Sequence, residues 1–281
     1  MTTPVQARRD RAGGSPWVYL TLCAGLVVVL GPFVWMLLGS LKPESELRQV
    51  PPTWWPEELT TANYVELFGR LDFPTYFLNS VVVAVAITLG NLAFCSMLAY
   101  ALAKLEFRGR RALFGLVIVM LMVPGMATFV PLFVLVSNIG LVNSFPGLIL
   151  PFVAGPFGVF LMRQFMLSIP DELIDAARVD GAGEARIFAR VVMPLCGPAL
   201  ATLGILTFLS SWNNFLWPLV VAQTEDKYTL PVALALVSVG QHNTRYGLLL
   251  AGAVVVVVPI ILVFLALQRY VVQGLAMTGI K

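Results

Sequence analysis

The chain has 281 residues, of which 58 % are hydrophobic and 12 % are charged, and its mean hydropathy is +0.86. Soluble domains are about half apolar and about a quarter charged, so this composition excludes a soluble domain and indicates a polytopic membrane protein. The net charge of +3 is too small to identify a partner by itself.

Six apolar stretches follow one another along the chain, at residues 17–39, 76–103, 113–137, 145–162, 197–222 and 246–267. A helix needs about 20 apolar residues to cross a bilayer, so each stretch predicts one membrane span. Residues 1–16 predict a cytoplasmic tail. No small-residue cleavage site follows the first span, so we expect this span to anchor the chain and not to be a removed signal peptide. Residues 40–74, with Trp54 and Trp55, predict a loop outside the membrane. The predicted fold is all-α, with a six-helix transmembrane domain over 17–267 and a cytoplasmic tail over 268–281.

A charged, amphipathic stretch, residues 163–196, separates the fourth and fifth spans. Ser168, Pro170 and Asp171 predict the start of a helix, and Asp180-Gly181 predicts its end. A second helix is predicted to run to Pro194. Its apolar stripe would be Ile187, Phe188, Val191 and Val192, and its polar face would carry Arg186 and Arg190. Two short helices that meet at a glycine predict an element that docks on a partner, and a loop of two solvated helices is the alternative.

The distribution of basic residues predicts the topology. Thirteen of the 18 lysines and arginines fall in the N-terminal tail, the turn between the second and third spans, the 163–196 stretch and the C-terminal tail. The other five are Lys42, Arg48, Arg70, Lys227 and Arg245. Short loops rich in Lys and Arg stay in the cytoplasm, so both termini and the 163–196 stretch are predicted to be cytoplasmic.

The spans as drawn contain no Asp, Glu, Lys, Arg or His. Ion-coupled transporters usually need such groups in the membrane. Prolines lie in every span except the second, and such breaks are common where transporter helices line a cavity, although a single proline can be a simple kink. The chain also lacks the Gly-rich phosphate loop that binds ATP. A transporter with these properties must take its energy from a partner.

The chemistry of an enzyme is not predicted. The single histidine, His242, has no second metal ligand nearby, and no paired carboxylates or nucleophile with a base are found in the apolar stretches. Cys23, Cys95 and Cys196 lack Cys-x-x-Cys spacing and are expected to be reduced thiols packed among apolar residues. An uncoupled channel or a membrane scaffold remains an alternative to a transporter subunit.

The 163–196 stretch resembles the coupling loop of ABC-importer permeases, Glu-Ala-Ala-x-x-x-Gly-x9-Ile-x-Leu-Pro, with Asp175, Val191 and Met193 as departures. Other parts resemble the smaller membrane subunit of carbohydrate importers of the maltose and glycerol-3-phosphate permease family. These parts are Ser40–Pro43, Ala62–Tyr64, Leu78–Ser80, Ser211–Pro218 and Gln268–Leu275. The resemblance runs from about residue 17 to the end, although the family usually ends Gly-x-Val-Lys-Gly and this chain ends Thr278-Gly279-Ile280-Lys281.

This resemblance implies a non-catalytic permease subunit of an ATP-driven sugar importer in a prokaryotic inner membrane, or alternatively of an importer of glycerol-3-phosphate or a related polyol-phosphate. It implies a second homologous permease, two ATPase subunits that bind ATP and Mg, an extracytoplasmic solute-binding protein and the lipid bilayer as partners, and no nucleic acid. The chain itself needs no cofactor or metal. The residues implied to contact the ATPase are Asp175, Ala176, Ala177, Asp180, Gly181 and Ala182.

Trp212, Asn213, Asn214 and Trp217, late in the fifth span, are candidates for the substrate path. Amide groups pair with sugar hydroxyls and indole faces stack on sugar rings. An aromatic belt at the membrane interface is the alternative for the tryptophans.

Overall fold

The computed structural model describes residues 16–238 and 245–278, with side chains up to residue 265. The predicted tail before Pro16 and His242 therefore lie outside the described residues. Every regular element in the described part of the chain is a helix, which confirms the all-α class. In order they are α1 (Pro16–Ser40), α2 (Glu44–Leu47), α3 (Ala62–Arg70), α4 (Phe73–Gly90), η1 (Asn91–Cys95), α5 (Ser96–Lys104), α6 (Arg110–Met122), α7 (Gly125–Asn138), α8 (Phe145–Ile149), η2 (Leu150–Phe152), α9 (Pro156–Leu167), α10 (Asp171–Val179), α11 (Glu184–Ile187), η3 (Phe188–Val192), α12 (Met193–Leu195), α13 (Gly197–Trp212), α14 (Leu216–Val221), η4 (Glu225–Lys227), α15 (Leu230–Ser238) and α16 (Tyr246–Thr278).

Three helical segments are long and apolar enough to cross a membrane: Pro16–Ser40, Phe73–Lys104 and Tyr246–Leu265. Three bent pairs of helices add three further candidate spans if each pair counts as one: α6 with α7, α8–η2 with α9, and α11–α12 with α13. The chain is thus an all-helical polytopic membrane protein. The last helix continues to Thr278, so most of the predicted C-terminal tail is helical.

Three predicted spans are interrupted, and the fourth breaks between η2 and α9 with a bend of 41°. The third bends by 103° between α6 and α7, where Val123 is extended and Pro124 caps the second helix. A residue before proline is driven out of the helical region, which explains the break. The fifth ends as a helix at Trp212 and resumes as α14 at Leu216. Pro218 lies in the first turn of α14, where its missing N–H costs nothing, but in an unbroken helix its ring would clash with the carbonyl four residues earlier, which explains the break before α14.

The second span contains a feature that its sequence does not reveal. Its helix widens to π geometry over η1, between α4 and α5. There the Asn91 amide donates to the carbonyls of Ile87 (3.1 Å) and Phe152 (2.6 Å), and its oxygen accepts from Gly155 N–H (3.1 Å). One side chain thus satisfies backbone groups at the break before α9, which hydrocarbon would leave unpaired.

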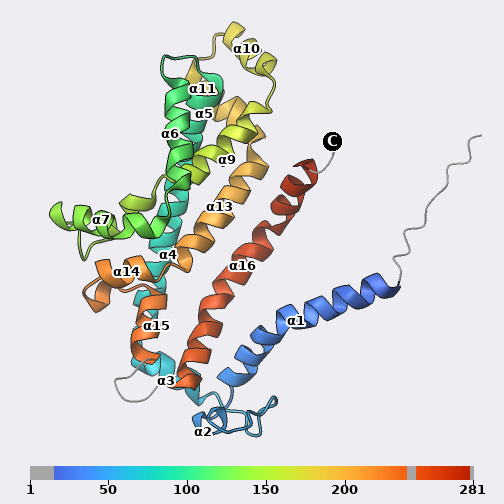
Figure 1. Cartoon of the computed structure of the whole chain (residues 1–281), viewed down its shortest axis with the longest axis vertical. Helices are drawn as coiled ribbons and strands as arrows, with labels where there is room; N and C mark the ends of the chain where they lie inside the picture. The colour runs from blue at the N-terminus through green and yellow to red at the C-terminus, as the bar shows by residue number, and fades with distance from the viewer. Residues whose placement is uncertain (1–15, 239–244, 279–281) are drawn as a thin grey trace, which may run out of the picture. The chain divides into compact units, whose positions relative to one another are not determined.

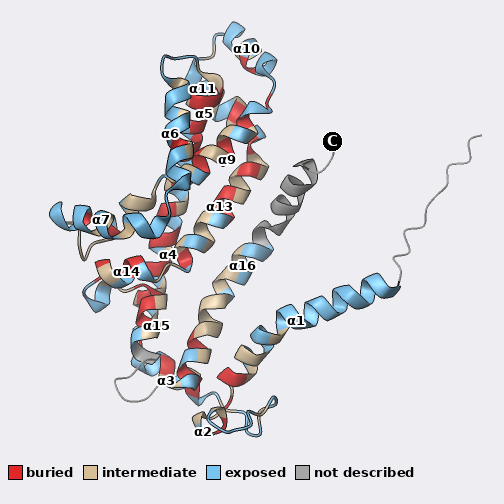
Figure 2. Cartoon of the chain, viewed as in Figure 1, coloured by how far each residue is buried: buried red, intermediate tan, exposed pale blue. Residues whose placement is uncertain are grey.

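The chain divides into two compact units. The N-terminal unit comprises residues 1–66 and 245–254, and the main unit comprises residues 67–244 and 255–281. In the main unit α4, α5, α9 and α13 pack side by side, α10 lies at one end and α15 lies towards the other (Figure 1). Buried residues concentrate in these four packed helices (Figure 2).

A buried polar network holds the loop of the N-terminal unit. Lys42, 2 % exposed, donates to the carbonyl of Thr53 (2.6 Å) and pairs with Glu46 (3.1 Å). Asn63 donates to the carbonyls of Ser40 and Lys42 at 2.9 and 2.8 Å. The two short motifs around Lys42 and Asn63 therefore act as parts of one folded loop.

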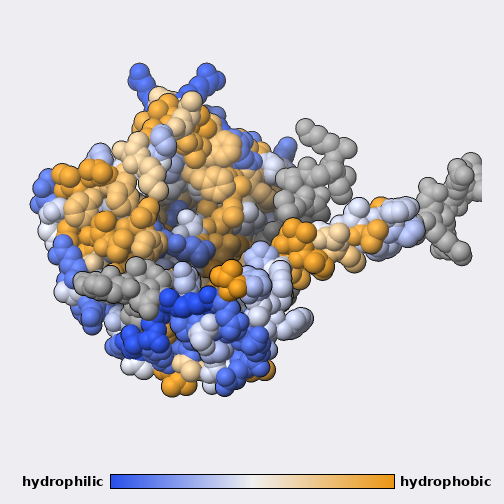
Figure 3. Space-filling model, turned by 60° about the horizontal axis from the view of Figure 1, so that its bottom comes forward, coloured by the Kyte–Doolittle hydropathy of each residue, from blue (hydrophilic) through white to orange (hydrophobic). Residues whose placement is uncertain are grey.

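Hydrophobic side chains also cover wide areas of the surface (Figure 3). In α1, Val27 and Val28 are 70 % and 74 % exposed, as expected for a helix that faces lipid. Cys95 and Cys196 are buried free thiols as predicted. The prediction was wrong for Cys23, which is exposed on α1 because this helix packs little of its surface within the chain.

Candidate functional site

The coupling stretch, residues 163–196, begins differently from its prediction. Ser168 does not cap α10: its hydroxyl donates back to Phe165 O (2.7 Å) at the end of α9. Pro170 occupies the cap position and Asp171 starts the helix. Two acidic residues, Asp171 and Glu172, lie in the first turn, where they interact favourably with the helix dipole.

The end of α10 is the predicted one. Gly181 has a φ of +78°, in the left-handed region that glycine adopts without steric cost. Its N–H donates to Arg178 O (3.0 Å), and Ala182 N–H donates to Ala177 O (3.0 Å). This pair of bonds is the Schellman motif, which satisfies the last helical carbonyls and turns the chain.

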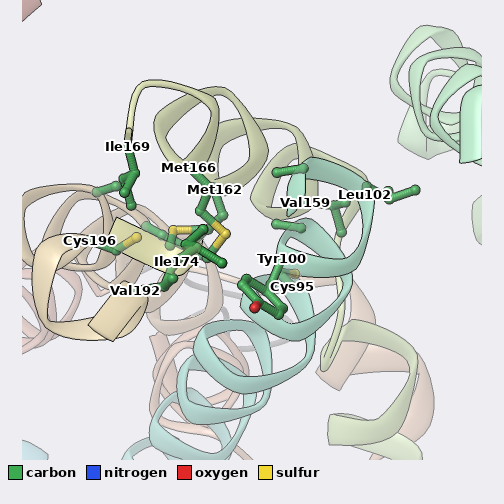
Figure 4. Packing of buried hydrophobic residues seen from close by; sticks show 14 of the residues in the cluster. Cys95, Tyr100, Leu102, Val159, Met162, Met166, Ile169, Ile174, Val192 and Cys196 are labelled. Atoms are coloured by element: carbon green, nitrogen blue, oxygen red, sulfur yellow. The ribbon is translucent and has the colours of Figure 1, made fainter. Parts of the chain in front are cut away.

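Apolar side chains anchor the stretch to the end of the main unit. Ile174 of α10 and Ile187 of α11 are 2 % and 0 % exposed and pack in one core with residues of α5 and α9. Figure 4 shows Ile174 directed towards Met162, Met166 and Val192. Fully burying one such side chain contributes about 1.5–3 kcal/mol, so α10 is firmly seated.

The second helix is confirmed in its extent and faces. A helical run covers residues 184–195, with π geometry over η3. Ile187 and Val192 are fully buried, Phe188 and Val191 are half-buried, and Arg186 and Arg190 are exposed. The run then bends by 81° into α13, so the stretch continues directly into the fifth predicted span.

Two polar links join the stretch to α5. The buried Tyr100 hydroxyl donates to Glu184 Oε2 (2.6 Å), whose Oε1 accepts from Arg178 Nε (2.9 Å). Lys104 Nζ donates to Ile169 O and to Asp171 Oδ1, both at 2.6 Å. The Lys104 ammonium lowers the pKa of Asp171, through that hydrogen bond first, so the link is charged at neutral pH. α10, α11 and α5 thus form one connected body.

The outer side of α10 is left exposed. Asp175, Ala176, Asp180 and Gly181 are exposed, as are the apolar Leu173 (47 %) and Val179 (88 %). Ala177 and Ala182, also predicted to contact the ATPase, are half-buried because they pack against the core of the main unit. The predicted set therefore lies together at the C-terminal end of α10 and in the turn that follows it, but two of its alanines face inward. Leu173 and Val179 were missed because an apolar residue at a helix surface is by itself common.

The two tryptophans of the predicted substrate path are core residues in this structure. Trp212 and Trp217 are each 2 % exposed. The indole N–H of Trp212 donates to Val256 O and that of Trp217 to Gly147 O, both at 3.1 Å. Trp212 stacks on Phe208, and Trp217 meets Phe129 and Phe152 edge to face. This packing leaves no open indole face for a sugar ring.

The two asparagines lie in the break between α13 and α14. Asn213 is exposed, and its amide donates to Leu209 O (3.0 Å). Asn214 lines a cleft of about 260 Å³ in the main unit. Other polar residues on this cleft are Asn91, Thr207, Ser210 and Ser211, its lining carries no charged residue, and the Ser211 hydroxyl has no hydrogen-bond partner there. The described residues contain no cluster of three metal-ligating side chains.

Comparisons with known proteins place these features. Residues 94–277 match the family model of the binding-protein-dependent transport system inner membrane component. The chain is 41 % identical over 257 residues to the arabinooligosaccharides transport system permease protein AraQ of Halalkalibacterium halodurans, covering 90 % of this chain and 92 % of that protein. It is 37 % identical over 249 residues to the diacetylchitobiose uptake system permease protein NgcG of Streptomyces coelicolor, covering 86 % and 81 %. Among solved structures, a bacterial ABC transporter involved in import of the acidic polysaccharide alginate matches with a TM-score of 0.82 and 26 % identity over 96 % of this chain and 100 % of that one.

Proposed function

The chain belongs to the family of binding-protein-dependent transport system inner membrane components, and from this membership we propose that it forms half of the path of an ATP-driven sugar importer. It is a multi-pass protein of the bacterial inner membrane and a non-catalytic subunit of its transporter. We infer that its partners are a homologous permease, two ATPase subunits that bind ATP and Mg, and an extracytoplasmic solute-binding protein.

The coupling role rests on one observation. The inner side of the coupling stretch is buried and hydrogen-bonded to the main unit, whereas its outer side is exposed. Ile174 and Ile187 fix it in the core, and Tyr100 and Lys104 tie it to α5. The exposed Val179 then offers an apolar contact to a partner groove, since burying such a side chain stabilises a complex by about 1.5–3 kcal/mol. The exposed Asp175 and Asp180 contribute less, because ion pairs at a surface are worth about 0–1 kcal/mol.

The bias of basic residues supports a cytoplasmic position for this stretch and for both termini. Thirteen of 18 lysines and arginines belong to the same side under this topology, in accord with the positive-inside rule. An ATPase that docks on the stretch would then be on the side that contains ATP.

The substrate class that the chain supports best is a neutral oligosaccharide or monosaccharide. The relatives named above are permeases for arabinooligosaccharides and diacetylchitobiose. The cleft at Asn214 is lined by amide and hydroxyl groups without a charged residue, and such groups pair with sugar hydroxyls. A polyol-phosphate is the second candidate, and it would need a cationic group that this cleft does not provide.

Reconstitution with the partner permease, the ATPase and the binding protein in proteoliposomes tests the proposal. We expect ATP hydrolysis to rise when the sugar-loaded binding protein is added, and Val179→Asp to remove this rise while the permease still inserts. Arg190→Gln, a change at an exposed residue of the second helix, is the control and should keep most of it. Sugar flux without any ATPase subunit would instead identify a channel, and assembly without flux would identify a scaffold.

A further inference from the structure

A second cleft lies where the turn between α5 and α6 meets α9 in the main unit. It has a volume of about 730 Å³. Its lining combines three arginines, Arg110, Arg111 and Arg163, with two aromatic rings, Phe107 and Phe114, and is completed by Glu106, Gly109 and Ala112. No step of the proposed transport function uses these residues.

Two of the guanidinium groups in this cleft, those of Arg110 and Arg163, are held by hydrogen bonds to backbone carbonyls. Arg163 Nε donates to Leu102 O (3.1 Å), and its guanidinium lies over the Phe114 ring at 3.7 Å. Arg110 Nη1 donates to Leu105 O (3.1 Å). Within the described residues, none of the three arginines forms an ion pair.

This arrangement leaves donors available for an anion. A guanidinium has five N–H donors in a planar fork, and the bonds above use one each on Arg110 and Arg163. A fork of this kind matches the oxygens of a phosphate, often in a bidentate way. Glu106, the one carboxylate on the lining, is outnumbered by the three positive charges. The chemistry of the cleft therefore favours a phosphate group.

The helix that begins at this cleft has an apolar, exposed surface. Leu113, Leu116, Val119 and Met120 of α6 are 46 %, 52 %, 57 % and 53 % exposed. They follow the arginines by one to three turns of a helix that is a candidate membrane span together with α7. A phosphate at the cleft would thus sit at the head of an apolar surface that suits acyl chains.

We propose that the cleft formed by Arg110, Arg111 and Arg163 binds the headgroup phosphate of an anionic phospholipid, whose acyl chains lie along α6. Basic pockets between membrane helices at the cytoplasmic surface bind such headgroups in general, and an anionic leaflet attracts clustered basic residues. This proposal concerns the lipid alone, so it stands whether or not the transported solute is a sugar.

Native mass spectrometry of the permease complex, purified from nanodiscs that contain phosphatidylglycerol and phosphatidylcholine, tests it. We expect the wild type to retain phosphatidylglycerol selectively. Arg110→Gln combined with Arg163→Gln should reduce this retention at least about tenfold, because each lost guanidinium removes charge-assisted hydrogen bonds to the phosphate. Arg186→Gln combined with Arg190→Gln removes the same charge from exposed sites and should leave retention within about twofold of the wild type, because surface charges contribute little individually.

Three results would overturn the assignment. Equal retention by the two double variants would mean that general charge and not this cleft holds the lipid. Binding of inorganic phosphate to the wild type but not to the Arg110/Arg163 variant, without selective retention of phosphatidylglycerol by the wild type, would identify a phosphate site without a lipid. Loss of the ATPase subunits from the Arg110/Arg163 variant, with lipid retention unchanged, would identify a protein interface. If the double variant does not insert, Arg110→Gln alone serves instead, because Arg110 is half-buried in the cleft and takes no part in the Phe114 contact. Lipid retention equal to the wild type would then overturn the proposal.

Discussion

Replacing Gly181 by alanine is the sharpest perturbation of the coupling stretch. Gly181 has a φ of +78°, and a Cβ built there meets nothing within 4 Å. The cost of the change is therefore backbone strain alone, about 1–2 kcal/mol for a residue forced into the left-handed region. If α10 must keep its observed shape to dock, this strain lowers the affinity for the ATPase subunit by a factor of about 5–30.

The assay is the binding of the purified ATPase subunit to the permease in nanodiscs, measured over a range of ATPase concentrations. Gly181→Asn should lose less than Gly181→Ala, because asparagine enters the left-handed region more readily. Gly183→Ala is a matched control two residues away: its φ of −72° suits any residue and its Cβ also meets nothing within 4 Å. Equal affinities for Gly181→Ala and the wild type, or an equal loss in Gly183→Ala, would refute the reasoning.

Three further changes test other parts of the structure. Tyr100→Phe removes the hydrogen bond to the Glu184 carboxylate, worth about 1.5–3 kcal/mol, and should raise the number of ATP molecules hydrolysed per solute imported; an unchanged ratio would remove Tyr100 from the coupling route. Asn91→Leu should lower the thermal stability of the purified permease by leaving backbone groups at the α9 break unpaired, and a wild-type melting profile would contradict this. Lys42→Met removes the ion pair with Glu46 and the hydrogen bonds to Thr53 in the N-terminal unit and should lower the thermal stability of the purified permease, measured by thermal unfolding. The hydrogen bond from Thr53, and then those from Lys42 and Glu57 N–H, hold the pKa of Glu46 below its ordinary 4.5. Its contribution should thus be complete above pH 4.5 and be lost as the pH falls through the lowered value; a loss between pH 6 and 8 would contradict the assignment.

The sequence predicted the parts of the fold that follow from hydropathy and from local turn chemistry. The apolar stretches coincide with three long helices and three bent helix pairs that are candidate spans. Asp180-Gly181 predicted the end of α10, because few residues accept a positive φ. The stripe of the second helix followed from helical periodicity and is confirmed at Ile187 and Val192.

The parts that failed depend on contacts between distant segments. Ser168 fits a cap by spacing, but the end of α9 takes its hydroxyl. Trp217 has an indole face of the kind that stacks on sugar rings, yet in the fold this ring packs against Phe129 and Phe152. The π segment begins at Asn91, whose amide donates to the carbonyl of Phe152, 61 residues away. Hydropathy and local spacing contain no information about partners that are distant in the sequence, so these contacts could not be predicted.

Photo-cross-linking from the outer side of α10 tests the central claim most directly. A photoreactive amino acid in place of Val179, 88 % exposed, would be activated in membranes that contain the whole transporter. The docking role predicts a cross-link to the ATPase subunit that a probe in place of Leu116, exposed on α6, does not give. A Val179 probe that reaches only lipid or the solute-binding protein, in membranes where the ATPase subunit is assembled, would contradict the account.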